Sequence, residues 1–401
     1  MDLDLIQSLV EKRETKIVLL VLDGLGGLPM EAGGETELEA ADTPNLDRLA
    51  REGICGLQLP VGPGITPGSG PGHLGLFGYD PIRYKVGRGV LSGLGIDFDL
   101  TPRDVAARGN FCTVDDEGKV VDRRAGRIPT ERGAELCKLL REIELEGVEL
   151  FVEPVKEYRF LLVLRGNGLS GDVDETDPLE VGEMPLDPQP LSAKAEGTAQ
   201  LVQQFVDQAG QILADQDPAN MVLLRGFSQL PDWPQFGDAF GLRAAAIAGY
   251  PMYRGVARLV GMDLLDSGHS VEDEFATLEE HWDDYDFFFL HVKRIDSAGE
   301  DGDFERKVSL IEEADALVPR LMELGPDVVL VTGDHSTPSR LKYHSWHPVP
   351  VLLWSEHCRA DRVEEFGERA CMAGGLGPRI PSMDLMPLAL ANARRLEKYG
   401  A

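Results

Sequence analysis

The sequence predicts an α/β fold in which a mostly parallel sheet is flanked by helices. Apolar runs of the length expected for strands buried on both faces occupy residues 16–24, 220–226, 284–294, 326–335 and 348–355. Segments with helical periodicity alternate with these runs along the chain. Alternation of this kind is typical of parallel sheets that carry helices on both faces.

Two helical segments are the clearest. In 41–53, Thr43 is placed to cap a helix, Pro44 occupies the first helical position and Gly53 follows the last turn. Residues 304–324 form an amphipathic stretch between two of the apolar runs, and we expect one long helix there.

The chain has 401 residues, which is too long for one simple hydrophobic core. From residue 84 to residue 235 the alternation becomes less regular, and acidic loops such as 171–190 appear. We therefore expect a core domain formed by 1–83 and 236–401, and a smaller domain, 84–235, inserted into it.

The composition narrows the class of partner. Lys and Arg number 39 and Asp and Glu number 69, which gives a formal net charge of −30. Such a surface repels nucleic acids and anionic membranes, and no apolar run approaches the ~20 residues of a membrane span. The N-terminus lacks the features of a signal peptide, and the five scattered cysteines form no CxxC pair. The sequence predicts a cytoplasmic protein with a small-molecule partner, no nucleic acid and no membrane.

Carboxylates and imidazoles follow several of the predicted strands. These residues are Asp23, Asp296, Glu300, Asp334, His335, His344 and His347. A single Asp after a strand is usually a turn or capping residue, but parallel strands bring their carboxyl ends to one edge of the sheet. Hard oxygen ligands combined with imidazoles suit Mn²⁺, Zn²⁺ or a similar ion, and their number favours two ions.

A serine lies in the glycine-rich segment 64–80. Ser69 stands between Gly68 and Gly70, just before a stretch that can become helical, where free backbone N–H groups would suit a phosphate oxygen. The alternative is a surface loop without function. Serine becomes a strong nucleophile when a metal ion lowers its pKa, so Ser69 together with the strand-end ligands predicts metal-dependent phosphoryl transfer.

Arginines are concentrated in or near the inserted region of this acidic chain. They are Arg108, Arg123, Arg124, Arg127, Arg159, Arg225 and Arg254. Each alone is explained by a surface salt bridge. As a group they are suited to hold a phosphate and a carboxylate, because the guanidinium fork binds both with two hydrogen bonds.

These motifs, in their order along the chain, resemble the cofactor-independent (2,3-bisphosphoglycerate-independent) phosphoglycerate mutases of the archaeal type, in the alkaline phosphatase superfamily. The segments that carry the resemblance are VLDGLGGLP (21–29), ADTPNLDRLAREGICG (41–56), PGSGPGHLGLFGYDP (67–81), RGNF (108–111), DRRAGR (122–127), YRFLLVLRGNGLS (158–170), YRGVARLVGMD (253–263), DSAGEDGDF (296–304), TGDHSTP (332–338) and HSWHPVPVLL (344–353).

The resemblance implies an alkaline-phosphatase-like core that binds two divalent ions and an inserted α/β lid domain that binds substrate. One ion would be held by Asp23, Ser69, Asp334 and His335, and the other by Asp296, Glu300 and His344. Mn²⁺ is the expected ion, with Mg²⁺, Co²⁺ and Zn²⁺ as alternatives. The implied enzyme is an isomerase of glycolysis and gluconeogenesis.

In the implied reaction, Ser69 takes the phosphoryl group of 3-phosphoglycerate as a phosphoserine and returns it to the 2-hydroxyl of glycerate. The lid must exclude water, because water would hydrolyse the phosphoserine. Arg254 is the expected second catalytic residue. The expected substrate-binding residues are His73, Arg108, Asp122, Arg124 and Arg225. For His73, which lies one helical turn after Ser69, a purely structural role is the equal alternative.

The sequence departs from the family pattern at two positions. The family motif D-x-x-x-H ends here in Glu300, which favours harder ions than Zn²⁺. Arg254 stands where the family has an active-site lysine. The extra imidazole of His347 is either a partner of the ligand His344 or a replacement for Glu300. These departures leave two alternatives to the mutase: a metal-dependent phosphatase or phosphodiesterase of the same superfamily, and a catalytically inactive relative.

Overall fold

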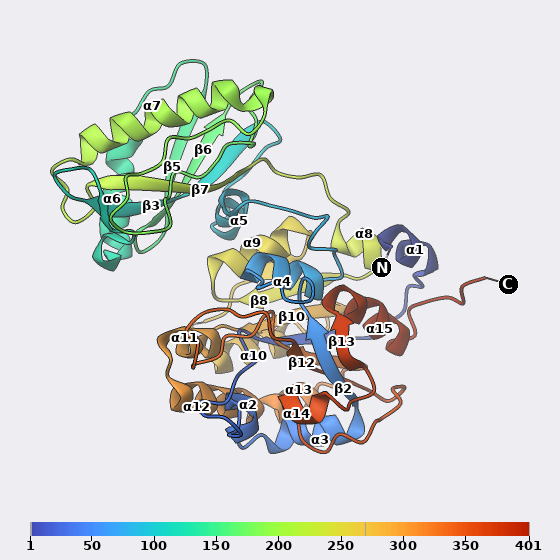
Figure 1. Cartoon of the computed structure of the whole chain (residues 1–401). Coiled ribbons are helices and arrows are strands. Elements are labelled where there is room, and N and C mark those ends of the chain that lie inside the picture. Colours follow the sequence, from blue (N-terminus) through green and yellow to red (C-terminus); the bar gives the residue numbers. More distant parts are fainter. Residues whose placement is uncertain (1, 269, 401) are drawn as a thin grey trace. The chain divides into compact units, whose positions relative to one another are not determined.

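The computed structural model describes residues 2–268 and 270–400. It divides into two compact units, which we call the core unit (1–85 and 233–401) and the inserted unit (86–232). In Figure 1 the inserted unit runs from blue-green to yellow-green, and both of its ends connect to the core unit. Within the described ranges, no helix is long and apolar enough to cross a membrane.

The core unit is built on an eight-stranded sheet with the order β13-β2-β12-β11-β1-β10-β8-β9. Its strands are β1 (Ile17–Leu22), β2 (Ile54–Leu59), β8 (Ala244–Ala248), β9 (Asp263–Leu265), β10 (Phe287–Val292), β11 (Val328–Thr332), β12 (Val349–Ser355) and β13 (Gly377–Pro381). Most neighbours are parallel, but β12 runs antiparallel to both β11 and β2. The predicted α/β class with a mostly parallel sheet is confirmed.

The central strands explain where a site can form. Every residue of β1, β10 and β11 is buried, which fits their uninterrupted apolar sequences. β1 pairs in parallel with β10 on one side and with β11 on the other. The carboxyl ends of these three strands therefore lie next to one another at one edge of the sheet.

Helices cover both faces of this sheet (Figure 1). They are α1 (Leu3–Leu9), α2 (Glu37–Ala40), α3 (Pro44–Glu52), α4 (Ser69–Leu76), α8 (Phe236–Phe240), α9 (Pro251–Leu259), α10 (Val271–Glu280), α11 (Arg294–Asp301), α12 (Phe304–Asp315), α13 (Val318–Glu323), α14 (Glu368–Cys371) and α15 (Leu385–Asn392). Helix α3 begins and ends as predicted. The single helix expected over 304–324 is wrong: α12 ends at Asp315 and α13 begins at Val318 with Pro319 in its first turn, because a proline cannot continue the hydrogen bonding of the preceding helix.

The inserted unit has a five-stranded sheet in which every described pair is antiparallel. Its strands and helices are α5 (Arg88–Gly95), β3 (Asp104–Val114), β4 (Val120–Asp122), α6 (Thr130–Leu140), β5 (Glu149–Lys156), β6 (Arg159–Arg165), α7 (Glu196–Leu213) and β7 (Met221–Ser228). The predicted strand at 220–226 is β7, which pairs with β3 in this sheet.

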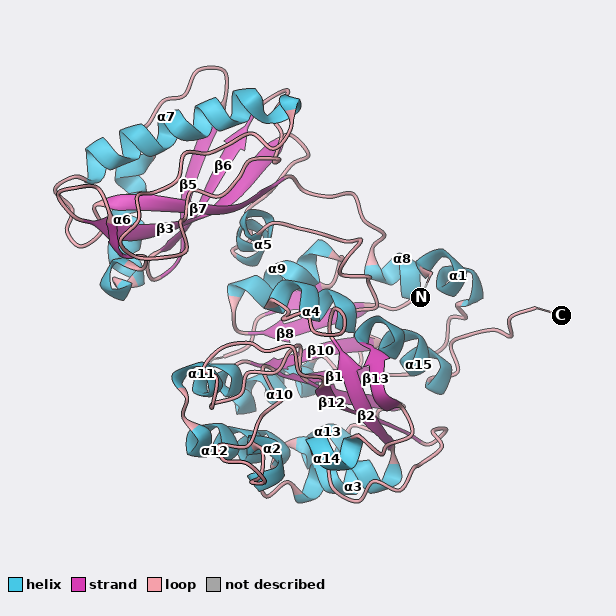
Figure 2. Cartoon of the chain, viewed as in Figure 1, coloured by secondary structure: helices cyan, strands magenta, loops and turns pink. Residues whose placement is uncertain are grey.

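The two faces of the inserted sheet differ in composition. Figure 2 shows α7 extended along the sheet, and α6 and α7 share one hydrophobic cluster with alternate residues of the strands. Val105, Ala107 and Phe111 of β3 belong to this cluster. Since side chains alternate along a strand, Arg108 projects from the opposite face.

Candidate metal and phosphoryl-transfer site

The predicted ligands gather at the carboxyl edge of the core sheet. Asp23 directly follows β1, while Asp334 and His335 follow β11. Asp296 lies in the first turn of α11, the helix that follows β10. Gly24 allows this close approach: it has φ +68°, and a Cβ there would lie 2.8 Å from Thr337 Oγ1 and 2.9 Å from Asp296 Oδ1.

Ser69 joins this cluster from a different part of the chain. It is the first residue of helix α4, where backbone N–H groups lack partners within the helix. Its Oγ lies 3.3 Å from Nε2 of His335. A Cβ at Gly72 would lie 2.4 Å from the carbonyl oxygen of Asp334, so a glycine here lets α4 pack directly against the loop that carries Asp334.

The hydrogen bonds around Thr337 fix the tautomer of His335. The Thr337 hydroxyl donates to Asp296 Oδ1 at 2.7 Å. It can then only accept from Nδ1 of His335, 2.9 Å away, so the proton of this imidazole is assigned to Nδ1. The lone pair of Nε2 consequently faces Asp334 Oδ2 at 3.1 Å and Asp23 Oδ1 at 3.5 Å.

Asp23, Asp334 and His335 form the first group that could hold a metal ion, and we call it the buried group. All three side chains are fully buried. Burial and repulsion from Asp23 raise the pKa of Asp334 well above its ordinary value. Burial lowers the pKa of His335, which keeps its imidazole neutral and able to bind a metal.

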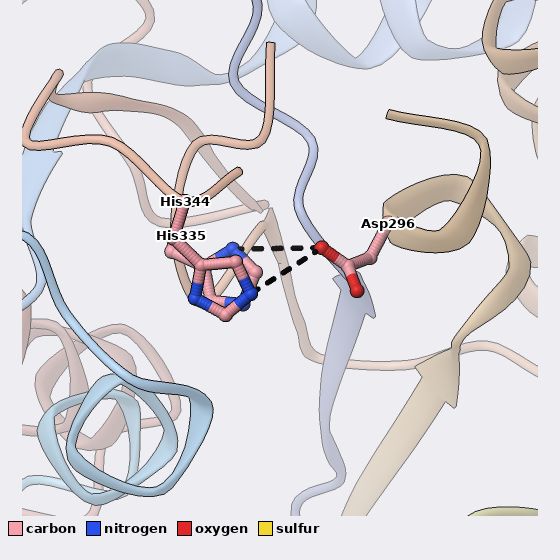
Figure 3. Close-up of side chains that lie close together, drawn as sticks. All are labelled: Asp296, His335 and His344. Atoms are coloured by element: carbon pink, nitrogen blue, oxygen red, sulfur yellow. Dashed lines mark ion pairs between the residues drawn. The ribbon is translucent and has the colours of Figure 1, made fainter. Parts of the chain in front are cut away.

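Asp296, His335 and His344 form the second group, which we call the open group. Asp296 Oδ1 lies 3.7 Å from His344 Nε2 and 4.0 Å from His335 Nδ1 (Figure 3). The two imidazole rings stack with their centroids 3.6 Å apart. His344 Nδ1 donates to the Pro67 carbonyl oxygen at 3.1 Å, which leaves its Nε2 available as a ligand.

Glu300 lies at the solvent side of the open group. Its Oε1 is 4.0 Å from His344 Nε2, and its side chain is 55% exposed. Burial of part of this carboxyl and repulsion from Asp296 raise its pKa. His347 belongs to neither group of the described residues: its Nδ1 lies 3.0 Å from Ser345 Oγ, and its ring stacks on Trp346.

The sequence analysis missed Lys293. Its Nζ pairs with the carboxylate of Asp296 and lies 3.3 Å from Asp23 Oδ2. Burial opposes its charge, but Asp23 and Asp296 outweigh burial and raise the pKa of Lys293. The sequence feature that could have indicated Lys293 is its position immediately after the buried strand β10 and three residues before Asp296.

Three aromatic side chains pack behind the buried group. His73 is fully buried, donates from Nδ1 to the Ser69 carbonyl oxygen at 2.8 Å, and packs against the rings of Tyr253 and His291. The expected contact of His73 with a phosphate stays a prediction, and its Nδ1 also lies 3.3 Å from Asp334 Oδ2. Burial lowers the pKa of His73 to about 3, so the imidazole is neutral. The sequence analysis did not single out Tyr253 or His291 for this site.

The donor set fits a divalent cation. Both carboxylate oxygens of Asp23, and Oδ2 of Asp334, are buried without a hydrogen-bond partner among the described residues. The Lys293 ammonium lies 3.3 Å from Asp23 Oδ2 but is shared with Asp296, so a bound cation would further compensate these buried carboxyl groups. Carboxylates, an imidazole and a serine oxygen are together a suitable set of ligands for a divalent ion such as Mn²⁺.

The other predicted site residues belong to other elements: Arg254 to the core unit, and Arg108, Asp122, Arg124 and Arg225 to the inserted unit. In α9, Arg254 pairs with Asp266 at 3.0 Å. In the inserted unit, Arg108 and Arg225 face each other across β3 and β7, and Arg225 pairs with Glu175 at 2.9 Å. Asp122 accepts hydrogen bonds from two backbone N–H groups of the following turn.

Arg124 is exposed on that turn, and its own backbone N–H is one of the two that Asp122 binds. The structure therefore brings Arg108 and Arg225 together on the sheet. Asp122 and Arg124 occupy the adjoining turn that begins at the end of β4.

Comparison with known proteins identifies the family. A model of the 2,3-bisphosphoglycerate-independent phosphoglycerate mutase family matches residues 50–220. A protein from Aquifex aeolicus, named a probable 2,3-bisphosphoglycerate-independent phosphoglycerate mutase, is 51% identical over all of both chains. A protein of the same name from Thermus thermophilus is 52% identical over 99% of this chain and 98% of its own. The chain belongs to this phosphoglycerate mutase family.

Two solved structures share the fold of this chain. A protein from Pyrococcus horikoshii superposes with a TM-score of 0.83 at 31% identity, covering 96% of this chain and 99% of its own. A cofactor-independent phosphoglycerate mutase from Thermoplasma acidophilum gives a TM-score of 0.70 at 30% identity, covering 94% and 100%. The resemblance to this family that the sequence motifs indicated is confirmed.

Proposed function

We propose that this protein is an isomerase that interconverts 3-phosphoglycerate and 2-phosphoglycerate through a phosphoserine at Ser69. The observation that carries the proposal is the position of Ser69 Oγ, 3.3 Å from His335 Nε2 and at the start of a helix. The family membership of the whole chain supports the same reaction.

We assign the metal ligands from the two groups. Asp23, Ser69, Asp334 and His335 would hold one divalent ion in the buried group. Asp296, Glu300 and His344 would hold a second in the open group. When bound, such ions lower the pKa of a serine hydroxyl and neutralise charge on a phosphoryl group. Mn²⁺ is the proposed ion, because the carboxylate-rich set with Glu300 favours a harder ion than Zn²⁺.

The protein groups perform two phosphoryl transfers. In the first, the Ser69 oxygen forms a bond to phosphorus while the bond from phosphorus to the 3-oxygen of glycerate breaks. The serine loses its proton, and the released 3-oxygen gains one. In the second, the 2-hydroxyl of the retained glycerate loses its proton and attacks the phosphoserine, and the serine oxygen leaves and regains a proton. The N–H groups at the start of α4 favour the charge of the phosphoryl oxygens.

Lys293 contributes a fixed positive charge next to the reacting group. Its ammonium pairs with Asp296 and lies near Asp23, one carboxylate from each ligand group. Phosphoryl transfer is accelerated mainly by positioning and by positive charge around the phosphoryl oxygens. Arg254, held by Asp266, remains the proposed second catalytic cation of the core unit.

We assign substrate binding to the inserted unit, 86–232, and metal binding to the core unit. Arg108 and Arg225 lie side by side on the sheet face opposite the hydrophobic cluster, as a pair of cations suited to an anionic substrate group. Asp122 and Arg124 on the adjoining turn complete the proposed set, while His73 is assigned a structural role. Retention of glycerate distinguishes a mutase from a phosphatase, because water must not reach the phosphoserine first.

The proposed reaction belongs to glycolysis and gluconeogenesis, and we propose the cytoplasm as its location. The cysteines are free, and four of them are buried: Cys55, Cys112, Cys137 and Cys371. Free thiols are usual in reducing compartments.

A product assay tests the proposed function. Purified protein is given Mn²⁺ and 3-phosphoglycerate, and 2-phosphoglycerate and inorganic phosphate are measured in the same samples. The proposal predicts that 2-phosphoglycerate forms with little release of phosphate. Phosphate release at the rate of substrate loss would instead identify a phosphatase, and the absence of any turnover would identify an inactive relative.

A further inference from the structure

A lysine that belongs to neither ligand group is completely buried beside the site. Lys307 lies in helix α12 and has no exposed surface. Its Nζ donates to the carbonyl oxygens of Gly24 at 2.9 Å, Gly26 at 3.1 Å and Thr337 at 2.9 Å. These three acceptors use all three N–H groups of the ammonium.

The acceptors belong to the two loops that carry the buried group. Gly24 and Gly26 follow the ligand Asp23, and Thr337 follows the ligand His335. The backbone N–H of Thr337 lies 3.3 Å from the Gly24 carbonyl oxygen and 3.0 Å from that of Gly26. Lys307 therefore binds the two loops where they already touch, one to three residues after the ligands.

A buried carboxylate, that of Glu37, binds backbone N–H groups of the same two loops. Glu37 Oε1 accepts from the Ser339 N–H at 2.7 Å, and Oε2 accepts from the Leu28 N–H at 3.2 Å. Glu37 Oε1 also lies 3.8 Å from Lys307 Nζ. Hence the cation Lys307 donates hydrogen bonds to carbonyl groups of the two loops, and the anion Glu37 accepts hydrogen bonds from their N–H groups.

Thr337 connects this buried ion pair to the ligands themselves. Its carbonyl oxygen accepts from Lys307, while its hydroxyl contacts both Asp296 Oδ1 and His335 Nδ1. A shift of Thr337 would therefore move Asp296, a proposed ligand of the second ion, and His335, a proposed ligand of the first. Outer partners of this kind set the orientation of metal ligands.

We infer that Lys307 is a positioning residue for the metal site, which holds the loops after β1 and β11 in the geometry that divalent ions require. This inference rests on the metal-dependent function proposed above. No uncharged side chain can replace Lys307, because only an ammonium group presents three donors to three convergent carbonyl groups.

Calorimetric titration with Mn²⁺ tests the inference on the full chain after chelation of bound metal. Lys307→Met keeps much of the apolar stem but removes the three donors. We expect it to weaken Mn²⁺ binding by about 10- to 100-fold, the usual effect of losing an outer partner of metal ligands. The rise in melting temperature on adding Mn²⁺ should shrink in parallel, because stabilisation by a ligand depends on its affinity.

Arg395→Met is the matched control. Arg395 is a second buried cation of the core unit, and it donates to Thr15 Oγ1 at 2.8 Å and to the Thr15 carbonyl oxygen at 2.7 Å. Thr15 precedes β1, so Arg395 acts at the end of the sheet opposite the ligands. Its loss should lower the melting temperature with and without Mn²⁺ and leave the Mn²⁺ affinity unchanged.

The outcomes separate the two levels of inference. A folded Lys307→Met variant with the Mn²⁺ affinity of the wild type overturns the role of Lys307. Where Lys307→Met does not unfold cooperatively, Lys307→Arg decides by the same titration, since the planar guanidinium keeps the charge but cannot reproduce the three-way donation. A wild-type protein that binds no Mn²⁺ would instead overturn the proposed function.

Discussion

The two ligand groups of the core unit share His335 but differ in burial and in support. In the buried group, Asp23, Asp334 and His335 are fully enclosed. In the open group, the side chain of His344 is 22% exposed and that of Glu300 is 55% exposed. The buried group is closed off from solvent, whereas the open group has Asp296 and His335 buried and reaches the surface through His344 and the neighbouring Glu300.

This difference explains where the sequence can vary. At the buried group, a Cβ added at Gly26 would lie 1.9 Å from Ser336 Oγ and one added at Gly72 would lie 2.4 Å from the Asp334 carbonyl oxygen. With neighbours so close, these glycines cannot be replaced by a larger residue without moving the loops that carry the ligands. Glu300 faces solvent, so a carboxylate can stand where the family pattern has an imidazole without disturbing the core. The open group is thus the place where metal preference can change.

The largest effect is expected at the nucleophile. Ser69→Ala removes the oxygen proposed to accept the phosphoryl group and should lower the mutase rate by more than about a thousandfold, in the range seen when a covalent nucleophile is lost. Because Ser69 is small and at the start of α4, the melting temperature without metal should change little. Coupled assay of 2-phosphoglycerate measures the rate. A variant that retains roughly a tenth of the wild-type rate would contradict the assignment.

The second largest effect is expected on the Mn²⁺ affinity of the buried group. Asp23→Asn removes a negative charge from the fully buried group and should weaken the tighter Mn²⁺ site by more than about 100-fold, beyond the loss typical of an outer partner. Titration calorimetry gives the affinity of each site. If Asp23→Asn changed only the weaker site, the buried group would not be the tight one.

A smaller effect is expected at the open group. Glu300→Gln keeps the shape of the side chain but removes its charge, and should weaken the second Mn²⁺ by about tenfold, because the carboxylate is more than half exposed. The same titration serves as the measurement. A loss as large as that of Asp23→Asn would mean that exposure does not distinguish the two groups.

The smallest change is one of selectivity. Glu300→His restores the imidazole of the family motif and should shift the ratio of Zn²⁺ to Mn²⁺ affinity toward Zn²⁺ by roughly tenfold, since imidazole is the softer ligand. Competition between the two ions, followed by elemental analysis of the bound metal, gives this ratio. An unchanged ratio would show that Glu300 does not contact the second ion.

The sequence predicted the residues whose position follows from a strand. Asp23, Asp334 and His335 follow uninterrupted apolar runs, and parallel pairing carries such residues to one edge. Lys293 and Lys307 escaped prediction for the opposite reason: a lysine is ordinarily a surface residue, and only the folded loops show which carboxylates and carbonyl groups surround it.

Two features of the fold depended on details that periodicity does not show. The apolar pattern of β12 is that of a buried strand in either direction, so its antiparallel pairing with β11 could not be read from it. The break of the helix just before Pro319 could be expected from a proline within an amphipathic pattern. His73 was ambiguous because helical spacing from Ser69 does not say whether a side chain faces solvent.

The central claim is that Ser69 carries the phosphoryl group between the two hydroxyls of glycerate. Its most direct test is mass spectrometry of the segment 64–80 after the Mn²⁺-loaded protein is mixed with 3-phosphoglycerate and quenched within a turnover. We expect one phosphoryl group, with fragment ions that place it on Ser69 and not on Thr66, and none in Ser69→Ala. An unmodified Ser69 while 2-phosphoglycerate accumulates, or a phosphoryl group on another residue, would contradict it.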